Sequence, residues 1–305
     1  MARMRMRTLA RLAGRLSGPG LVAAVLLILL VPALAGGGYP SLGNIATRFY
    51  RLHSDLPAAE VQDLAAFLDQ MFFSYARVFH YDVRRRSTLD VYVYRTREEF
   101  LSFCAERGLG RSVLQMRGLY IPELYELAAW GSGEEARHVL AHEGTHQFIA
   151  LVTKPDHQPP QWFHEGLASY FETANWKNGT LTLGAVNFDR LAALVPMYTQ
   201  GHFVPKIPLG DLLTTQDFTA THYAEAWSFV YFLLHAYGGR NAEVLNRYFI
   251  LIQQGQDPVR AFVAAFQTPL DAVDGAWRAY VEELLKKDLS QLLALPAEST
   301  APSGH

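Results

Sequence analysis

Two predicted helices joined by a proline-rich loop limit how this chain can fold more than any other feature. Ser132 and Glu135 form a capping-box pattern, which predicts the start of a helix that runs to about Val152. Two consecutive prolines then precede a second predicted helix over residues 161–172. Because the prolines interrupt the helical pattern, we expect the second helix to turn back and pack against the first.

Small residues occur on both predicted helices. Gly144 lies in the first helix, and Gly166, Ala168 and Ser169 lie in the second. Because their side chains are short or absent, we expect the two backbones to approach closely where these residues face one another.

The rest of the chain changes from a mixed pattern to a helical one. Before the two helices, strands are expected over 89–94, 118–121 and 124–130, and helices over 57–79 and 98–107. After them, the Asn-Gly turn at 178–179 predicts a small hairpin, and further helices are expected over 188–195, 221–237, 242–254, 258–266 and 270–285. Strands first and helices afterwards indicate an α+β fold.

These patterns divide the chain into four segments. We expect a leader over residues 1–35 and an N-terminal α+β lobe over 36–154, which ends with the first of the two helices. A helical C-terminal lobe over 155–290 and a disordered tail over 291–305, rich in Ala, Ser and Pro, complete the chain.

The leader has the layout of a secretory signal peptide. Five Arg and no acidic residue precede an apolar run over 21–31, and Ala33-Leu34-Ala35 follows. A helix of that run is about 16 Å long, well short of the ~30 Å hydrocarbon layer. We therefore expect cleavage after Ala35 and export to the periplasm or the extracellular space. An uncleaved membrane anchor is the alternative, and it is the only membrane association that we expect.

Charge and cysteine usage exclude several kinds of partner and site. The formal net charge is −2, and without the five Arg of the leader it is −7. That balance argues against a nucleic-acid partner, which needs a basic face. The single cysteine, Cys104, excludes an internal disulfide and a multi-cysteine metal site, so it is expected in the core and any metal must be held by His and carboxylate side chains.

One face of the first predicted helix carries a metal-ligand pattern. His142 and His146 are four residues apart, so both imidazoles can reach one ion, while Glu143 lies about 100° round the helix and can reach a water molecule. His138 continues the spacing but lies about 12 Å along the axis from His146, too far to share an ion with it. We therefore expect His142 and His146 to be the ligands and His138 to have a packed or hydrogen-bonded structural role.

A hydrolytic zinc site needs a third protein ligand and an open position for water. The residues after His146 contain no histidine at the spacing of a metzincin site. The candidate is Glu165 on the second helix, with 18 residues between it and His146. Two imidazoles and a carboxylate favour Zn²⁺.

The motif at 142–146 (HExxH) and the segment 162–172 together resemble the two motifs of the gluzincins, zinc metallopeptidases of the peptidase MA clan. The second segment is similar to that of the aminopeptidase branch. Over roughly residues 39–285 the chain looks like the peptidase-MA-like domain of unknown function found in bacterial exported proteins. The resemblance implies a zincin-like fold with a two-helix zinc core, in which both histidines and Glu165 bind zinc and Glu143 is the general base.

The chain departs from the aminopeptidase branch where those enzymes hold the free amine of the substrate. They carry Gly-x-Met-Glu-Asn, whereas residues 118–123 here are Gly-Leu-Tyr-Ile-Pro-Glu. Glu123 or Glu126 could substitute, although a surface position is the preferred interpretation of both. We therefore expect an endopeptidase rather than an aminopeptidase, with 124–129 as an edge strand that pairs with an extended peptide.

The resemblance also implies a Tyr or His that stabilises the oxyanion. His222 and Tyr223 follow Glu165 by 57 and 58 residues, and Tyr223 resembles the donor of the aminopeptidase branch. Tyr223 is preferred and His222 is the alternative. Ser169 stands where some gluzincins have an Asp that orients a zinc-bound His.

The preferred hypothesis is an exported zinc-dependent peptidase that acts on a peptide or protein substrate. The rival is a non-catalytic zincin-like binding module of the cell envelope, supported by the missing amine anchor. Glu143 argues against the rival, because a purely structural zinc site needs no general base.

Overall fold

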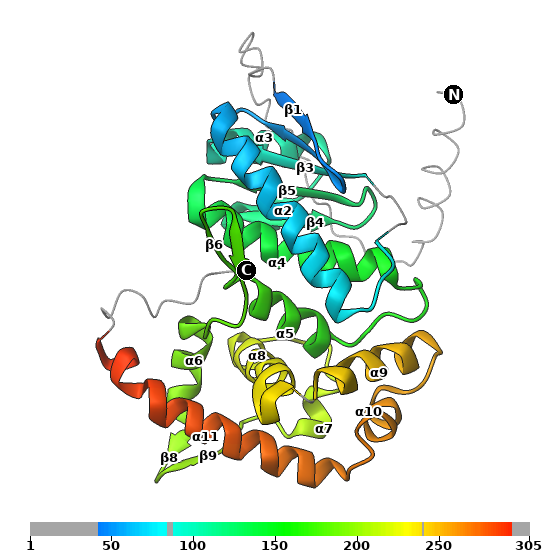
Figure 1. Ribbon diagram of the computed structural model, residues 1–305, viewed down its shortest axis with the longest axis vertical. Helices are drawn as coiled ribbons and strands as arrows, with labels where there is room; N and C mark the ends of the chain where they lie inside the picture. Colours follow the sequence, from blue (N-terminus) through cyan, green and yellow to red (C-terminus); the bar gives the residue numbers. More distant parts are fainter. Residues whose placement is uncertain (1–41, 84–87, 240, 295–305) are drawn as a thin grey trace, which may run out of the picture. The chain divides into compact units, whose positions relative to one another are not determined.

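A five-stranded mixed sheet forms the first part of the described chain (Figure 1). The computed structural model describes residues 42–83, 88–239 and 241–294, so the expected leader and residues 295–305 of the expected tail lie outside it. Every described element belongs to one compact unit, Pro40–His305. The strands are β1 (Gly43–Ala46), β2 (Tyr50–Ser54), β3 (Leu89–Tyr94), β4 (Gly118–Ile121) and β5 (Glu126–Trp130).

The strand order is β1-β2-β3-β5-β4, with β2, β3 and β5 parallel and the two outer strands antiparallel. The expected edge strand at 124–129 is therefore wrong, because β5 pairs with β3 on one side and β4 on the other. Leu127, Ala128 and Ala129 are fully buried, as in a strand covered on both faces. The edge strand next to β5 is β4, and the edge strand at the other side of the sheet is β1.

Helices cover both faces of the sheet. Helices α2 (Ala58–Val78) and α4 (Gly133–Val152) pack on one face and share the main core. Helix α3 (Arg97–Glu106) covers the other face with a smaller core that includes buried Cys104, as expected.

The start of α4 differs from the expected capping box. Ser132 is the N-cap residue, but its side chain makes no capping hydrogen bond to any described residue. The Gly133 N–H instead donates to Oε1 of Glu60 on α2 at 2.8 Å, and Glu135 pairs with Arg117 at 2.6 Å. A carboxylate from another helix thus takes the place of the local cap.

The remainder of the described chain is mostly helical. Its helices are α5 (Gln161–Phe171), α6 (Phe188–Leu194), α7 (Leu209–Leu212), α8 (Ala220–His235), α9 (Ala242–Gln253), α10 (Pro258–Phe266) and α11 (Leu270–Ala294), with 3₁₀ turns at Arg111–Gln115, Val195–Met197 and Ala236–Gly239. Two hairpins, β6 (Asn175–Lys177) with β7 (Thr180–Thr182) and β8 (Tyr198–Thr199) with β9 (His202–Phe203), interrupt them. The fold is α+β, and α11 continues into the first residues of the expected tail. No helix of the described residues is both long and apolar enough to cross a membrane.

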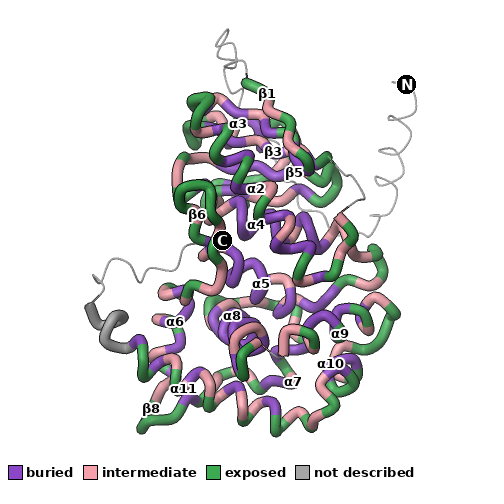
Figure 2. The backbone as a smooth tube through the Cα atoms, viewed as in Figure 1, coloured by how far each residue is buried: buried purple, intermediate pink, exposed green. Residues whose placement is uncertain are grey.

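Helix α5 lies between α4 and α8, and buried residues run through all three helices (Figure 2). The small residues do not act as expected. A Cβ at Gly166 would lie 2.6 Å from the carbonyl oxygen of Ala226 on α8, and a Cβ at Gly144 would lie 3.0 Å from the hydroxyl of Tyr75 on α2. The close approach through Gly166 is therefore between α5 and α8, and it holds α5 in place.

Candidate metal centre

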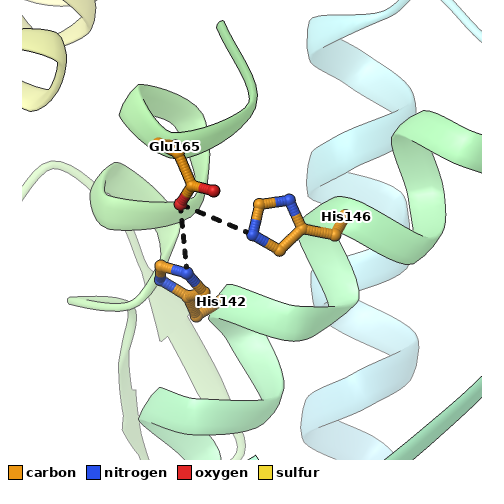
Figure 3. Close-up of side chains that lie close together, drawn as sticks. All are labelled: His142, His146 and Glu165. Atoms are coloured by element: carbon orange, nitrogen blue, oxygen red, sulfur yellow. Dashed lines mark ion pairs between the residues drawn. The ribbon is translucent and has the colours of Figure 1, made fainter. Parts of the chain in front are cut away.

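Helices α4 and α5 bring the three predicted ligands together (Figure 3). Oε2 of Glu165 lies 3.6 Å from Nε2 of His142 and 3.7 Å from Nε2 of His146, and the three ligand atoms lie within 4.8 Å of one another. In a tetrahedral zinc site with bonds of about 2.1 Å, ligand atoms lie about 3.4 Å apart. His142 and Glu165 are buried. This group of residues fits a metal ion.

The charges in the group depend on one another. Burial acts to raise the pKa of Glu165, but the neighbouring imidazoles outweigh it and lower that pKa to about 2. Burial acts to lower the pKa of His142, but the neighbouring carboxylates of Glu165 and Glu172 raise it to about 10. Burial lowers the pKa of His146, and the charge on His142 lowers it further. Without a metal ion and near neutral pH, His142 is therefore the charged histidine and His146 is neutral.

Glu172 orients His142 from the end of α5. Its Oε2 accepts a hydrogen bond from Nδ1 of His142 at 2.7 Å, which turns Nε2 toward Glu165. Sequence reasoning missed this role because it considered Ser169, whose buried Oγ has no hydrogen-bond partner among the described residues. Glu172 follows Glu165 by seven residues, or two helical turns, so it lies on the same face of α5.

Glu143 lies beside the group at the boundary of two cavities. The first cavity, of about 730 Å³, is also lined by His142 and Glu172, and the second, of about 460 Å³, by His146 and Glu165. Glu143 lines both. The surface that a ligand can reach therefore extends to both sides of the three candidate ligands.

The edge strand β4 reaches this boundary. The Tyr120 N–H donates to Oε2 of Glu143 at 2.9 Å, so this main-chain group points away from β5. Gly118 of the same strand lines the first cavity and Tyr120 the second. An extended chain placed along β4 would pass in front of Glu143.

The possible substitutes for the amine anchor lie elsewhere. Oε2 of Glu126 pairs with Nε of Arg107 at 2.8 Å, and Glu123 is absent from the described lining of the second cavity. Among the described residues, the carboxylates that line the second cavity are Glu143 and Glu165.

Tyr223, on α8, lies near the group, whereas His222 is engaged elsewhere. Burial raises the pKa of Tyr223 to about 12, and the charges of Glu165 and Glu143 contribute to the rise. Nδ1 of His222 accepts a hydrogen bond from the Thr219 N–H at 3.1 Å and so caps the start of α8.

Two further histidines lie close to the centre. His138 lies outside the three-residue group: it lines the first cavity, and its Nε2 lies 3.6 Å from Oε1 of the exposed Glu134. The ring of His164 stacks on that of His146, with 5.8 Å between the ring centres, and His164 lines the second cavity. Burial lowers the pKa of His164 to about 3, so this ring is neutral.

Comparison with known proteins identifies one related segment. A family model described as "Protein of unknown function (DUF1570)" matches residues 138–248, a little over a third of the chain. No curated protein matches the chain. The matched segment contains His142, His146 and Glu165, together with Glu143 and Tyr223, so it includes the whole candidate centre but not the sheet.

Proposed function

We propose that this protein is an exported zinc-dependent peptidase of the gluzincin type with a zincin-like fold. The observation that carries the proposal is the convergence of His142, His146 and Glu165, with Glu143 beside them at the boundary of two cavities. A purely structural metal site has no need of a carboxylate that is open to a ligand on both sides.

The donor set favours zinc, because imidazole and carboxylate suit that ion at a site with three protein ligands. When bound, zinc supplies Lewis acidity, which polarises a peptide carbonyl and lowers the pKa of water. Glu172 holds His142 in the orientation and tautomer that such a ligand needs. The burial of His142 and Glu165 keeps bulk water from competing with these contacts.

Glu143 is the general base and then the general acid of the proposed reaction. Its carboxylate accepts a proton from the attacking water and passes it to the nitrogen of the leaving amine. The position at the cavity boundary supports this role, since a peptide bond that crosses from one cavity to the other lies within reach of the carboxylate.

Tyr223 donates a hydrogen bond to the oxygen on which negative charge develops. Its pKa of about 12 supports this role, because the hydroxyl keeps its proton at neutral pH. His222 is less suitable, since Nδ1 is used to cap α8.

The substrate is a peptide that lies along β4 as an added strand. Cavities on both sides of Glu143 support cleavage within a chain over removal of an N-terminal residue. The basic leader and the apolar run that follows it support export.

The test compares the wild-type protein with Glu143→Gln and with Glu134→Gln, an exposed carboxylate on the same helix. We expect about one zinc per chain in all three by elemental mass spectrometry. A peptide library should be cleaved by the wild type and by Glu134→Gln but not by Glu143→Gln. Cleavage that survives in Glu143→Gln contradicts the role of Glu143, and zinc without any cleavage indicates a non-catalytic binding module.

A further inference from the structure

Arg190, on α6, is a buried arginine beside the candidate centre. Its side chain is 9% exposed, its guanidinium carbon lies 5.2 Å from the ring centre of Tyr223, and its Nε lies 3.8 Å from Oε1 of Glu172. One cation therefore lies next to the group that orients His142 and next to the proposed oxyanion donor.

A charge in this position is unfavourable unless it interacts with its neighbours, because burial removes the water that solvates it. Nε and Nη2 of Arg190 are enclosed, and no described residue offers either atom a hydrogen-bond acceptor. The interactions that offset the burial include the charges of Glu172 and Asp189 and the face of the Tyr223 ring.

The start of α6 fixes Arg190 relative to Glu172. The side chain of Asn187 donates to the carbonyl oxygen of Ser169 at 3.1 Å and to Oε1 of Glu172, while its own oxygen accepts from the Arg190 N–H at 3.1 Å. One oxygen of Glu172 thus faces His142, and the other faces Asn187 and Arg190. This arrangement restricts rotation of the carboxylate.

We propose that Arg190 is a positioning residue that holds the Glu172 carboxylate and the Tyr223 ring together, and through them the metal ligand His142 and the oxyanion donor. The link to Tyr223 rests on the proposed peptidase function, whereas the link to Glu172 rests only on the metal centre. Arg190 acts through these neighbours, because two of its three nitrogens are enclosed and Arg190 is absent from the described lining of both cavities.

The experiment compares Arg190→Met with Arg107→Met. Arg107 pairs with Glu126 and lies over the ring of Phe103 in the smaller core, so its loss removes the same kinds of contact away from the centre. In the full chain, zinc affinity is measured by competition with a chelator. The constants kcat and KM are measured with a peptide of the library that the wild type cleaves. Circular dichroism establishes that each variant is folded.

We expect the zinc Kd of Arg190→Met to rise about tenfold, as for loss of a group that supports a ligand. Its kcat should fall about tenfold or more, with KM within about twofold, because positioning acts on the reaction step. Arg107→Met should match the wild type in zinc Kd and in kcat. Arg190→Lys should recover part of the zinc affinity but little kcat, since an ammonium group restores the charge without the planar fork.

The results distinguish a failure of the proposed role of Arg190 from a failure of the proposed peptidase function. A folded Arg190→Met that binds zinc and turns over like Arg107→Met overturns the proposal. If the wild type cleaves nothing, the peptidase function fails, and the zinc affinities alone decide for or against Arg190. If Arg190→Met does not fold, kcat is compared between Arg190→Lys, Tyr223→Phe and the variant that carries both substitutions. Independent effects of the two substitutions on kcat would contradict a shared role of Arg190 and Tyr223.

Discussion

Glu172 accepts a hydrogen bond at 2.7 Å from the nitrogen of His142 that faces away from the other candidate ligands. The pair joins the end of α5 to the middle of α4, next to the contacts through Glu165. A carboxylate in this position fixes the tautomer of the histidine and raises its basicity as a ligand.

Replacing this carboxylate should weaken metal binding. We expect Glu172→Gln to raise the zinc Kd about 10- to 100-fold, because the neutral amide orients His142 less firmly. Ser169→Ala is the control, since Oγ of Ser169 has no hydrogen-bond partner among the described residues. Chelator competition measures both, and an equal loss in the two variants would contradict the role of Glu172.

Metal binding should release a proton. His142 has a pKa of about 10 in the metal-free protein, so near neutral pH an entering ion displaces one proton from it. Zinc affinity should therefore rise with pH up to about 10. Calorimetry at one pH in buffers of different ionisation enthalpy measures the release, and heats that do not depend on the buffer would refute it.

The same pKa predicts how the stability of the metal-free protein depends on pH. Folding raises the pKa of His142 from 6.5 to about 10, so its contribution is complete below about pH 6.5 and is lost as the pH rises toward 10. Urea unfolding of metal-free protein between these values should show falling stability. The effect should be smaller in Glu172→Gln, which keeps Glu165 but lacks another of the partners that raise this pKa.

Adding a methyl group at Gly166 should separate α5 from α8. The new Cβ would lie 2.6 Å from a main-chain oxygen that cannot move freely, and we expect a loss of about 1–3 kcal/mol in the free energy of unfolding. Gly275→Ala, within α11, is the matched control because its Cβ would meet no described atom within 4 Å. That change should stabilise by about 0.5–1 kcal/mol. If urea unfolding showed that the two substitutions change the free energy of unfolding in the same direction, the packing argument would be contradicted.

Removing the hydroxyl of Tyr223 should affect the reaction but not the metal. We expect Tyr223→Phe to lower kcat about 100- to 1,000-fold with unchanged zinc content, since one oxyanion donor is lost. Tyr231→Phe on the same helix removes a hydroxyl that donates to Gly184, and it should keep kcat within about threefold. A loss in Tyr231→Phe as large as in Tyr223→Phe would show that the effect comes from the helix rather than from the donor.

The three candidate ligands could be predicted because helical geometry determines their positions. His142 and His146 are one turn apart, and a return of the chain after the prolines places Glu165 opposite them. Glu172 was missed because only the residue one turn after Glu165 was considered, whereas the carboxylate lies two turns after it. Its partner Asn187 comes from another helix, and no local pattern indicates that contact.

The sheet shows where local patterns were insufficient. Strand β2 was not predicted, although Arg51 and His53 alternate with buried residues as in a half-buried strand. The strand is only five residues long, and its pairing with β3 depends on distant sequence. The β5 segment was correctly expected as a strand but placed at the edge, although its run of buried apolar residues is typical of an inner strand. Strand order depends on contacts between distant segments, which no single segment encodes.

The hydrogen bond between the Tyr120 N–H and Glu143 has a consequence for the order of events at β4. One main-chain N–H makes one strong hydrogen bond, so a peptide that pairs with β4 at this residue must displace the carboxylate. The Glu143 side chain would then be released as the peptide arrives. Binding of the peptide strand and release of the Glu143 carboxylate would then be a single step. Without a bound peptide, the carboxylate would stay hydrogen-bonded to the Tyr120 N–H.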